Sequence, residues 1–480
     1  MAYSQHLIIP DRSGTQVLLL MDGSGWRLPR VTDSDWMLVG KAQSWVRERL
    51  GLVIVVLRCV LVEEDDTREG TGDAFLFTEN LNDAAPRSGS WLDEKATSAV
   101  MDERERTVIR QWFMEMREGG PRELQPWEYP GWFATAVDWI ETKLPATVRV
   151  DQYSTWCVSS LHRVETASGR YYFKAAPTIF RHEASVTEML AERFPETIPR
   201  PIAIERERGW FLTADFGDEL VATMDAPDWE GALNALVTLQ RSSVASVESL
   251  LRSGCTDRRP RVLQRQVEEL AAEGSEWLPE EMATRLRAAL SRFQDLCEEV
   301  ATSPIPNTLV HGDFHAENVA VSEGRYLIFD WTDACIAHPF VDAVTCLRNA
   351  ESTPADQATR TRWRDHYLHG WEDLASRDAA SELFERMAPL AAMHQAVTYR
   401  SLLDSLDLSE RWQFGSALHD WVARALAVRG FVGRGVGSLQ PASAACPLVI
   451  ESPCGALTVW GFCGGEDDFP ARFVPRFRRV

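Results

Sequence analysis

Two short stretches decide how this chain is interpreted: His311-Gly312-Asp313-Phe314-His315-Ala316-Glu317-Asn318 and, soon after it, Ile328-Phe329-Asp330-Trp331. The second stretch ends an apolar run that we expect to form a β-strand, so that Asp330 stands at the end of the strand. Phosphoryl transfer from ATP uses a carboxylate near the acceptor hydroxyl, and an amide oxygen and a second carboxylate that hold magnesium on the phosphates. Asp and Asn residues in a turn often only cap neighbouring helices. The three groups together, at this spacing, favour phosphoryl transfer.

The same block resembles the aminoglycoside phosphotransferase family, which includes choline-type and other small-molecule kinases and has a protein-kinase-like fold. Members of that family carry His-Gly-Asp at the catalytic loop, as at 311–313 here. The resemblance implies that Asp313 is the catalytic base and that Asn318 and Asp330 are the metal ligands. It also implies ATP and Mg²⁺ as cofactors, and a hydroxyl group of a small molecule as the phosphoryl acceptor.

A kinase-like fold also requires a lysine on a strand and a glutamate on the helix that follows. Lys174 lies near the end of a β-prone aromatic run, and residues 180–194 have helical periodicity. Glu183 shares the apolar stripe of that helix, whereas Glu188 points away from it. A carboxylate on a buried stripe needs a cation, so we expect Lys174 and Glu183 to form an ion pair that holds the nucleotide phosphates.

The remaining nucleotide contacts are predicted from the hairpin before Lys174 and from the corner after residue 212. The hairpin has no glycine before Gly169, which departs from the glycine-rich loop of protein kinases. Ser154 and Thr155 could donate to phosphate there, although an ordinary β-turn is nearly as good an interpretation. By resemblance, the corner is the hinge between two lobes, and residues 213–215, including Thr213 and Asp215, would pair with adenine.

Composition limits the class of protein and its partners. A chain of 480 residues with 45% hydrophobic residues and 18 tryptophans predicts two or more well-packed domains. Its 50 basic and 71 acidic residues give a net charge of -21. This charge argues against a nucleic-acid partner or an anionic membrane surface, and it is compatible with a cationic substrate.

We expect a cytoplasmic protein. Residues 1–10 lack the pattern of a signal peptide, and no stretch reaches the roughly 18 apolar residues of a membrane helix. The nine cysteines lack paired spacing and are expected to be reduced thiols. Cys446, Cys454 and Cys463 cluster near the C-terminus without the Cys-x-x-Cys spacing of zinc sites.

Residues 1–120 alternate between predicted strands (16–20, 53–62 and 74–78) and predicted helices (44–50 and 102–116). Part of this region resembles the Nudix hydrolase pattern, in which W-x-L-P-G-G leads into a helix bearing R-E-x-x-E-E-x-G. The scaffold positions of that pattern are kept at Trp26, Leu28, Pro29, Gly51 and Leu52.

The catalytic positions of the Nudix pattern are not kept. Its first glycine is Arg30, its isolated glutamate is Trp36, and its Arg-Glu pair is Ser44-Trp45. Of the final two glutamates only Glu48 remains, because the second is Arg49. One carboxylate cannot assemble a divalent metal site on the helix, so we expect a Nudix-like fold without Nudix hydrolysis.

The predicted architecture is therefore α+β: an α/β Nudix-like domain (1–120), then a two-lobed kinase-like domain (121–430), then a tail (431–480). Within the second domain we expect a small β lobe at about 133–215 and a large helical lobe at about 216–430. Helices are predicted at 133–144, 229–240, 261–301, 361–374, 379–403 and 408–428, with a break at Pro389. The tail could be loose or could contain a strand pair at 448–450 and 457–460.

The functional hypothesis is an ATP- and magnesium-dependent phosphotransferase acting on a small-molecule hydroxyl. A sensor that binds nucleotide without turnover is the alternative. A protein kinase is disfavoured because no activation-loop and A-P-E segment follows Asp330. Asp342 is expected to cap or anchor a helix. By resemblance, the acceptor would lie between the catalytic loop and the C-terminal helices, where the candidate residues are Asp333, His394, Gln395, Tyr399 and Asp404.

Overall fold

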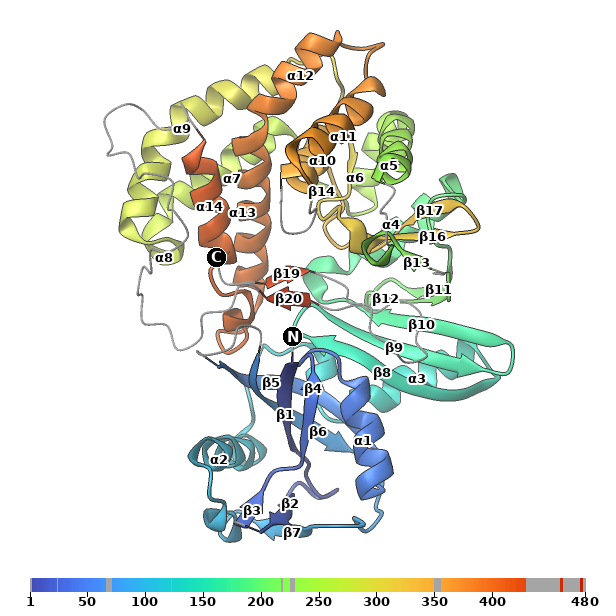
Figure 1. The fold of residues 1–480 in the computed structure, drawn as a ribbon, viewed down its shortest axis with the longest axis vertical. Helices are drawn as coiled ribbons and strands as arrows, with labels where there is room; N and C mark the ends of the chain where they lie inside the picture. The colour runs from blue at the N-terminus through green and yellow to red at the C-terminus, as the bar shows by residue number, and fades with distance from the viewer. Residues whose placement is uncertain are drawn as a thin grey trace.

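Three groups of elements follow one another along the chain in the structure, which is a computed structural model (Figure 1). It describes residues 2–23, 25–65, 71–121, 123–216, 219–224, 229–348, 355–428, 458–460 and 475–477. In Figure 1 the blue N-terminal unit, residues 2–118, lies against a green-blue lobe of strands, and a mostly helical lobe in green to orange lies beyond it. This mixed α+β arrangement is consistent with the predicted two-lobed kinase-like fold.

The N-terminal unit is built on a four-stranded mixed sheet flanked by two helices. The sheet has the order β4 (Arg30–Ser34), β1 (Ala2–Ile8), β6 (Thr71–Asn80), β5 (Ile54–Glu64), and only β1 and β6 are parallel. Leu7 and Ile8 are both fully buried, and because side chains alternate along a strand, each packs into a different core. One core contains residues of α1 (Gly40–Leu50) and the other contains residues of α2 (Glu103–Glu118).

A smaller antiparallel sheet joins the same unit, in the order β3 (Gly25–Arg27), β2 (Gln16–Asp22), β7 (Ser90–Asp93). Helix α1 corresponds to the helix of the Nudix-like pattern. Its one remaining carboxylate, Glu48, is exposed, and within the described ranges no cluster of three or more His, Cys, Asp or Glu side chains could hold a metal ion. The Nudix-like identity of this unit stays a prediction.

The small lobe is a five-stranded antiparallel sheet with one edge toward the N-terminal unit. Its order is β11 (Pro201–Glu205), β12 (Trp210–Ala214), β10 (Gly169–Ala175), β9 (Ser159–Thr166), β8 (Thr147–Trp156). The predicted helix at 133–144 is α3 (Trp132–Lys143), and the one at 180–194 is α4 (His182–Arg193). Trp132 and Trp139 of α3 pack edge to face against Trp210, which ties α3 to the sheet.

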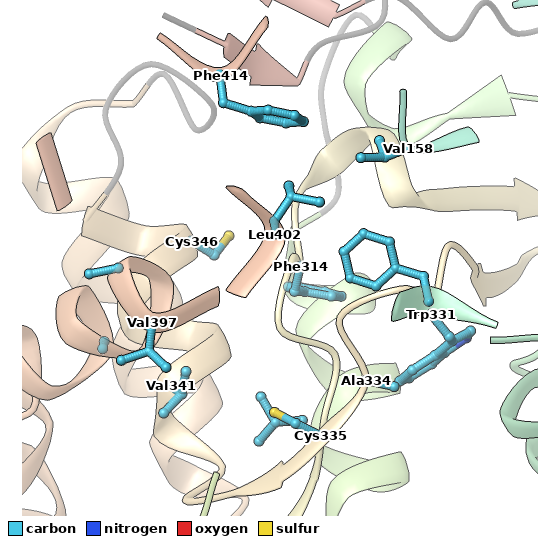
Figure 2. Packing of buried hydrophobic residues seen from close by; sticks show 14 of the residues in the cluster. Val158, Phe314, Trp331, Ala334, Cys335, Val341, Cys346, Val397, Leu402 and Phe414 are labelled. Atoms are coloured by element: carbon cyan, nitrogen blue, oxygen red, sulfur yellow. The ribbon is translucent and has the colours of Figure 1, made fainter. Parts of the chain in front are cut away.

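The large lobe is mainly helical, and it carries the catalytic segment between its helices. Its helices are α5 (Trp229–Ser243), α6 (Val247–Arg252), α7 (Pro260–Ala272), α8 (Gly274–Trp277), α9 (Glu280–Ala301), α10 (Phe340–Arg348), α11 (Gln357–His369), α12 (Arg377–Arg386), α13 (Ala388–Ser405) and α14 (Ala417–Ala427). Short strands surround the catalytic segment: β13 (Glu219–Leu220), β14 (Thr256–Asp257), β15 (Thr308–Val310), β16 (Val319–Ser322), β17 (Arg325–Ile328) and β18 (Cys335–Ala337). Figure 2 shows how Trp331, Ala334 and Cys335 of this segment pack with Val341 and Val397 of neighbouring helices in one core.

Two predicted helices are interrupted in the structure. The helix predicted at 261–301 is three helices, because the chain ends α7 near Gly274 and restarts after Pro279, which flanks α9. The helix predicted at 408–428 is a 3-10 turn, η7 (Arg411–Phe414), followed by α14. The break expected at Pro389 is confirmed, since α12 ends at Arg386 and Pro389 occupies the first turn of α13.

Of the tail, the structure describes only β19 (Thr458–Trp460), which pairs antiparallel with β20 (Pro475–Phe477). The other strand predicted for the tail, residues 448–450, lies outside the described residues, as do Cys446, Cys454 and Cys463. The six cysteines elsewhere are buried and form no disulfide within the described residues. Within the described part of the chain, none of the helices combines the length and apolar character needed to cross a membrane.

Candidate active site

Lys174 joins the two lobes through its ammonium group. It lies on β10, and its Nζ is 2.8 Å from Glu183 Oε1 on α4 and 2.8 Å from Asp330 Oδ1 at the end of β17. Burial alone lowers the pKa of Lys174, but Asp330 and Glu183 outweigh burial and raise that pKa above its usual range. Lys174 therefore stays protonated, and the predicted Lys174–Glu183 pair is formed.

The helix that carries Glu183 presents its two glutamates as the periodicity predicts. Glu183 is 1% exposed and shares the buried face with Val186 and Leu190. Glu188 lies on the outer face, where it pairs with Arg206. The helical period thus selects which carboxylate reaches the strand lysine.

The catalytic loop is held by hydrogen bonds to its backbone. The carboxylate of Asp342, in the first turn of α10, accepts from His311 N and from Gly312 N, each at 2.9 Å. Gln240 Nε2 also donates to Asp342 at 3.1 Å. Asp342 therefore anchors more than the helix on which it lies: it fixes the two residues that precede Asp313.

Gly312 is required by the shape of this loop. Its φ of 85° lies in the left-handed region, and a Cβ there would be 2.4 Å from the backbone oxygen of Asp333. His311 Nε2 lies 2.9 Å from Phe329 O, so the loop is also tied to the residue before Asp330. Residues 311–313 and Asp330 are consequently held close together.

Asp313 is contacted by two side chains from its own loop. Asn318 Nδ2 donates to Asp313 O at 2.9 Å, and His315 Nε2 lies 3.3 Å from Asp313 Oδ2. Burial lowers the pKa of His315, but the neighbouring carboxylates, Asp313 first, raise it to about 9 overall. A protonated His315 therefore places a positive charge beside the Asp313 carboxylate. His315 lies within the first quoted stretch, but its role could not be assigned from the sequence.

Asn318 and Asp330 are adjacent across a two-stranded ladder. Val319 pairs with Ile328, and Phe329 N donates to Asn318 O at 3.1 Å. Because the amide nitrogen of Asn318 is satisfied by Asp313 O, its side-chain oxygen remains as a ligand, and Asp330 supplies a carboxylate. Two such oxygen donors suit Mg²⁺, which binds few protein ligands and keeps water and phosphate oxygens. The residues present therefore fit the predicted metal.

Asp330 has an unusual backbone conformation, with a φ of 64°. The left-handed region is unfavourable for a residue with a Cβ, so the surrounding contacts must hold it there. Thr332 Oγ1 donates to Asp330 Oδ1 at 2.6 Å, next to the bond from Lys174. Burial raises the pKa of Asp330, but Lys174 and Thr332 more than offset this and leave that pKa below its usual value.

One cavity brings Lys174, Asp313 and Asp330 together between the lobes. Its other walls come from the β8–β9 turn, from the segment after Asp330 and from α13 and η7: Val158, Ser159, Phe180, Thr332, Asp333, Gln395, Thr398, Tyr399, Leu402 and Phe414. Figure 2 shows Val158, Leu402 and Phe414 converging on this space from three separate elements. Of the acceptor candidates, Asp333, Gln395 and Tyr399 line the cavity.

Several predicted site residues lie elsewhere. Ser154 and Thr155 are buried in β8, where Thr155 N donates to Met37 O at 3.2 Å, so the cavity is lined by Val158 and Ser159 from the turn instead. His394 is buried against Cys335, with its Nε2 3.3 Å from Cys335 Sγ. Asp404 pairs with Arg400 on the same helix. The cavity wall does not include Ser154, Thr155, His394 or Asp404.

The predicted hinge residues lie at the C-terminal end of β12, an inner strand of the sheet, and just after it. Thr213 is buried in β12, and Asp215 N donates to Arg170 O at 3.0 Å. The carboxylate of Asp215 is 3.6 Å from the Arg170 guanidinium. The backbone amide of Asp215 already donates within the sheet, so it is a poor donor to adenine. The predicted pairing of Thr213 with adenine stays a prediction.

Comparison with known proteins supports the class that this geometry indicates. Residues 161–390 match the model of the phosphotransferase enzyme family. This match covers the lysine strand, the catalytic loop and the metal aspartate, and it supports the kinase-like family for that part of the chain. The N-terminal unit lies outside the matched residues. No curated protein matches this chain.

Solved structures similar to this chain include small-molecule kinases. A choline kinase from Streptococcus pneumoniae has 15% sequence identity, covers 61% of this chain and 97% of its own, and gives a TM-score of 0.44. An ethanolamine kinase from Plasmodium vivax has 11% identity, with 69% and 91% covered and a TM-score of 0.43. A spectinomycin phosphotransferase in complex with ADP and spectinomycin has 13% identity, with 61% and 97% covered and a TM-score of 0.43.

Gly312→Ala tests the geometry of the catalytic loop. The added Cβ would meet the Asp333 backbone in a region of φ that alanine avoids, so the loop must shift. We expect transfer activity to fall by about 100-fold, as for a displacement of about 1 Å at a reacting centre. Phosphoryl transfer by the purified variant measures this. Gly324→Ala is the control, because Gly324 also has a positive φ but faces open space. Equal activity of the two variants would show that the loop tolerates the shift.

Proposed function

We propose that this protein is an ATP- and magnesium-dependent phosphotransferase that transfers the γ-phosphoryl group to a hydroxyl of a small molecule. The observation that carries the proposal is one cavity lined by Lys174, Asp313 and Asp330. Lys174 is charged and oriented by Glu183, and Asp313 is held by the anchored loop. The match of residues 161–390 to the phosphotransferase enzyme family supports the same class.

In the proposed mechanism each residue of the site has a separate role. Lys174 holds the α- and β-phosphate oxygens. Asn318 Oδ1 and the Asp330 carboxylate would hold Mg²⁺, which when bound would neutralise charge on the phosphates. Asp313 orients the acceptor hydroxyl and takes its proton as the oxygen attacks the γ-phosphorus. The bond from that phosphorus to the bridging oxygen breaks, and ADP leaves with the electron pair. Positioning and charge neutralisation supply most of the rate.

The acceptor side of the cavity favours a positively charged molecule. Asp333 and Asp313 both line the cavity there. The rings of Tyr399 and Phe414, whose centres are 6.1 Å apart, add aromatic surface. A carboxylate and aromatic faces together suit a substituted ammonium group. We therefore propose that the acceptor carries its hydroxyl near a cationic nitrogen.

Asp313→Asn should abolish transfer and leave nucleotide binding nearly intact, because Asp313 faces the acceptor. Loss of the base should lower turnover by roughly 10²–10⁴-fold. Turnover with a panel of amino alcohols, sugars and aminoglycosides, and nucleotide titration by calorimetry, measure the two properties. Full activity in the variant would remove the proposed role. Nucleotide binding by the unmodified protein, without turnover on any acceptor, would favour the sensor.

Asp330→Ala should weaken nucleotide binding and activity together, because it removes a metal ligand. The effect should be confined to the magnesium-dependent part of the binding. Titrating nucleotide with and without magnesium separates the two parts, with Asp378→Ala, an exposed aspartate on α12, as the control. Unchanged magnesium dependence would assign the metal to other residues.

The charge of Asp333 makes cation binding pH-dependent. Burial and the neighbouring carboxylates Asp313 and Asp330 raise the pKa of Asp333 to about 8, so it is mostly neutral at pH 7 and ionised above pH 8. A cation binds the ionised form better, so kcat/KM for a quaternary ammonium alcohol should rise by up to about tenfold from pH 7 to pH 9. An uncharged alcohol of the same shape, and the variant Asp333→Asn, should lack this rise. The same rise for both alcohols would exclude the assignment.

A further inference from the structure

The edge strand of the small lobe is paired with the N-terminal unit. Strand β8 lies at the edge of its sheet, and residues 36–39, which we call the strap, lie along it. Val39 N donates to Tyr153 O and Thr155 N donates to Met37 O, each at 3.2 Å. An open edge offers unpaired backbone groups, and here the strap occupies them.

Two buried glutamines reinforce this contact. The side chain of Gln152 on β8 donates to Val56 O and accepts from Val56 N, both at 2.8 Å. Gln43 on α1 accepts from Gln152 N at 3.1 Å and donates to Ile54 O at 2.8 Å. Because both amides are buried, their partners would be left unsatisfied if the N-terminal unit moved away. The unit is thus fixed to β8 just before the turn that lines the cavity.

The strap also contacts the large lobe. Trp36 is 1% exposed, and its ring centre is 5.8 Å from that of Trp412 in η7. Two residues after Trp412, Phe414 lines the cavity and packs on Trp156 of β8 at 5.6 Å. Adjacent residues of the strap therefore bind different lobes: Trp36 contacts the large lobe and Met37 bonds to the small lobe.

We propose that the strap is an interlobe clamp, and that Trp36 is a positioning residue that sets how far the two lobes open. Two-lobed kinases admit and release nucleotide by relative motion of their lobes. In this chain the β8–β9 turn and Phe414 both line the cavity, and the strap contacts the segments that carry them. The clamp holds Val158 and Ser159 over Lys174 in a hairpin that lacks the usual glycines.

The clamp makes a prediction that does not require turnover. In the full-length protein, Trp36→Ala and Trp412→Ala should each accelerate amide hydrogen exchange at residues 157–160 by at least about tenfold. Because both single variants remove the same contact, that between Trp36 and Trp412, exchange in the double variant should be no faster than in the faster single variant. Trp421→Ala is the matched control, since Trp421 is a half-buried tryptophan of α14 that stacks with Arg424. It should leave the exchange at residues 157–160 unchanged.

Kinetics give a second readout, and this one rests on the proposed function. Loosening the clamp should raise KM for nucleotide about three- to tenfold without lowering kcat, because opening also speeds product release. Trp36→Phe should keep the KM for nucleotide close to that of the unmodified protein. Exchange at 157–160 that stays unchanged in Trp36→Ala and Trp412→Ala would overturn the clamp. If Trp36→Ala does not fold, Trp412→Ala decides alone. Absence of turnover in the unmodified protein would refute the proposed function while the exchange result still decides the clamp.

Discussion

The ammonium of Lys174, which is mostly shielded from solvent, links the two lobes of this protein. A charge in a buried position is costly unless opposite charges compensate it, and Lys174 finds one carboxylate in each lobe, Glu183 on α4 and Asp330 after β17. Loss of either carboxylate would leave Lys174 with a partner in only one lobe. The same requirement brings the strand lysine next to Asp330, the proposed metal ligand.

The catalytic loop depends on a second buried carboxylate, that of Asp342. It accepts from two successive backbone amides, which are otherwise hard to satisfy in a loop that contains a left-handed glycine. Gln395 of α13 donates to Gly312 O at 2.6 Å and supports the loop from the other side. Helices α10 and α13 thus fix the position of Asp313, although neither helix carries the base.

The polar centre of the site could be predicted from the sequence because its residues occur in short contiguous patterns. Asp313, Asn318 and Asp330 belong to one segment, and the helical period alone selected Glu183 over Glu188. The walls of the cavity could not be predicted, because Ser159, Tyr399 and Phe414 come together only through tertiary packing. The position of Ser154 and Thr155 outside the cavity wall could not be predicted for the same reason, because they pair with residues 37–38, which are far away in the sequence. Gly274 and Pro279 were local signals for the interrupted helix, and their breaking effect outweighed the apolar period around them.

The strap also bears on the N-terminal unit and its predicted Nudix-like fold. The position where that pattern has its isolated glutamate is Trp36, which is buried against Trp412. A carboxylate at this position would lose its hydration against Trp412, at a cost on the order of several kcal/mol. The contact with the large lobe and a metal ligand at position 36 are therefore incompatible. Ser44 and Arg49 are exposed on α1, and nothing in the structure explains the absence of carboxylates there. Under the predicted Nudix-like fold, packing would account for the missing carboxylate at position 36, and because a hard divalent cation needs several oxygens at once, that absence alone would weaken a metal site.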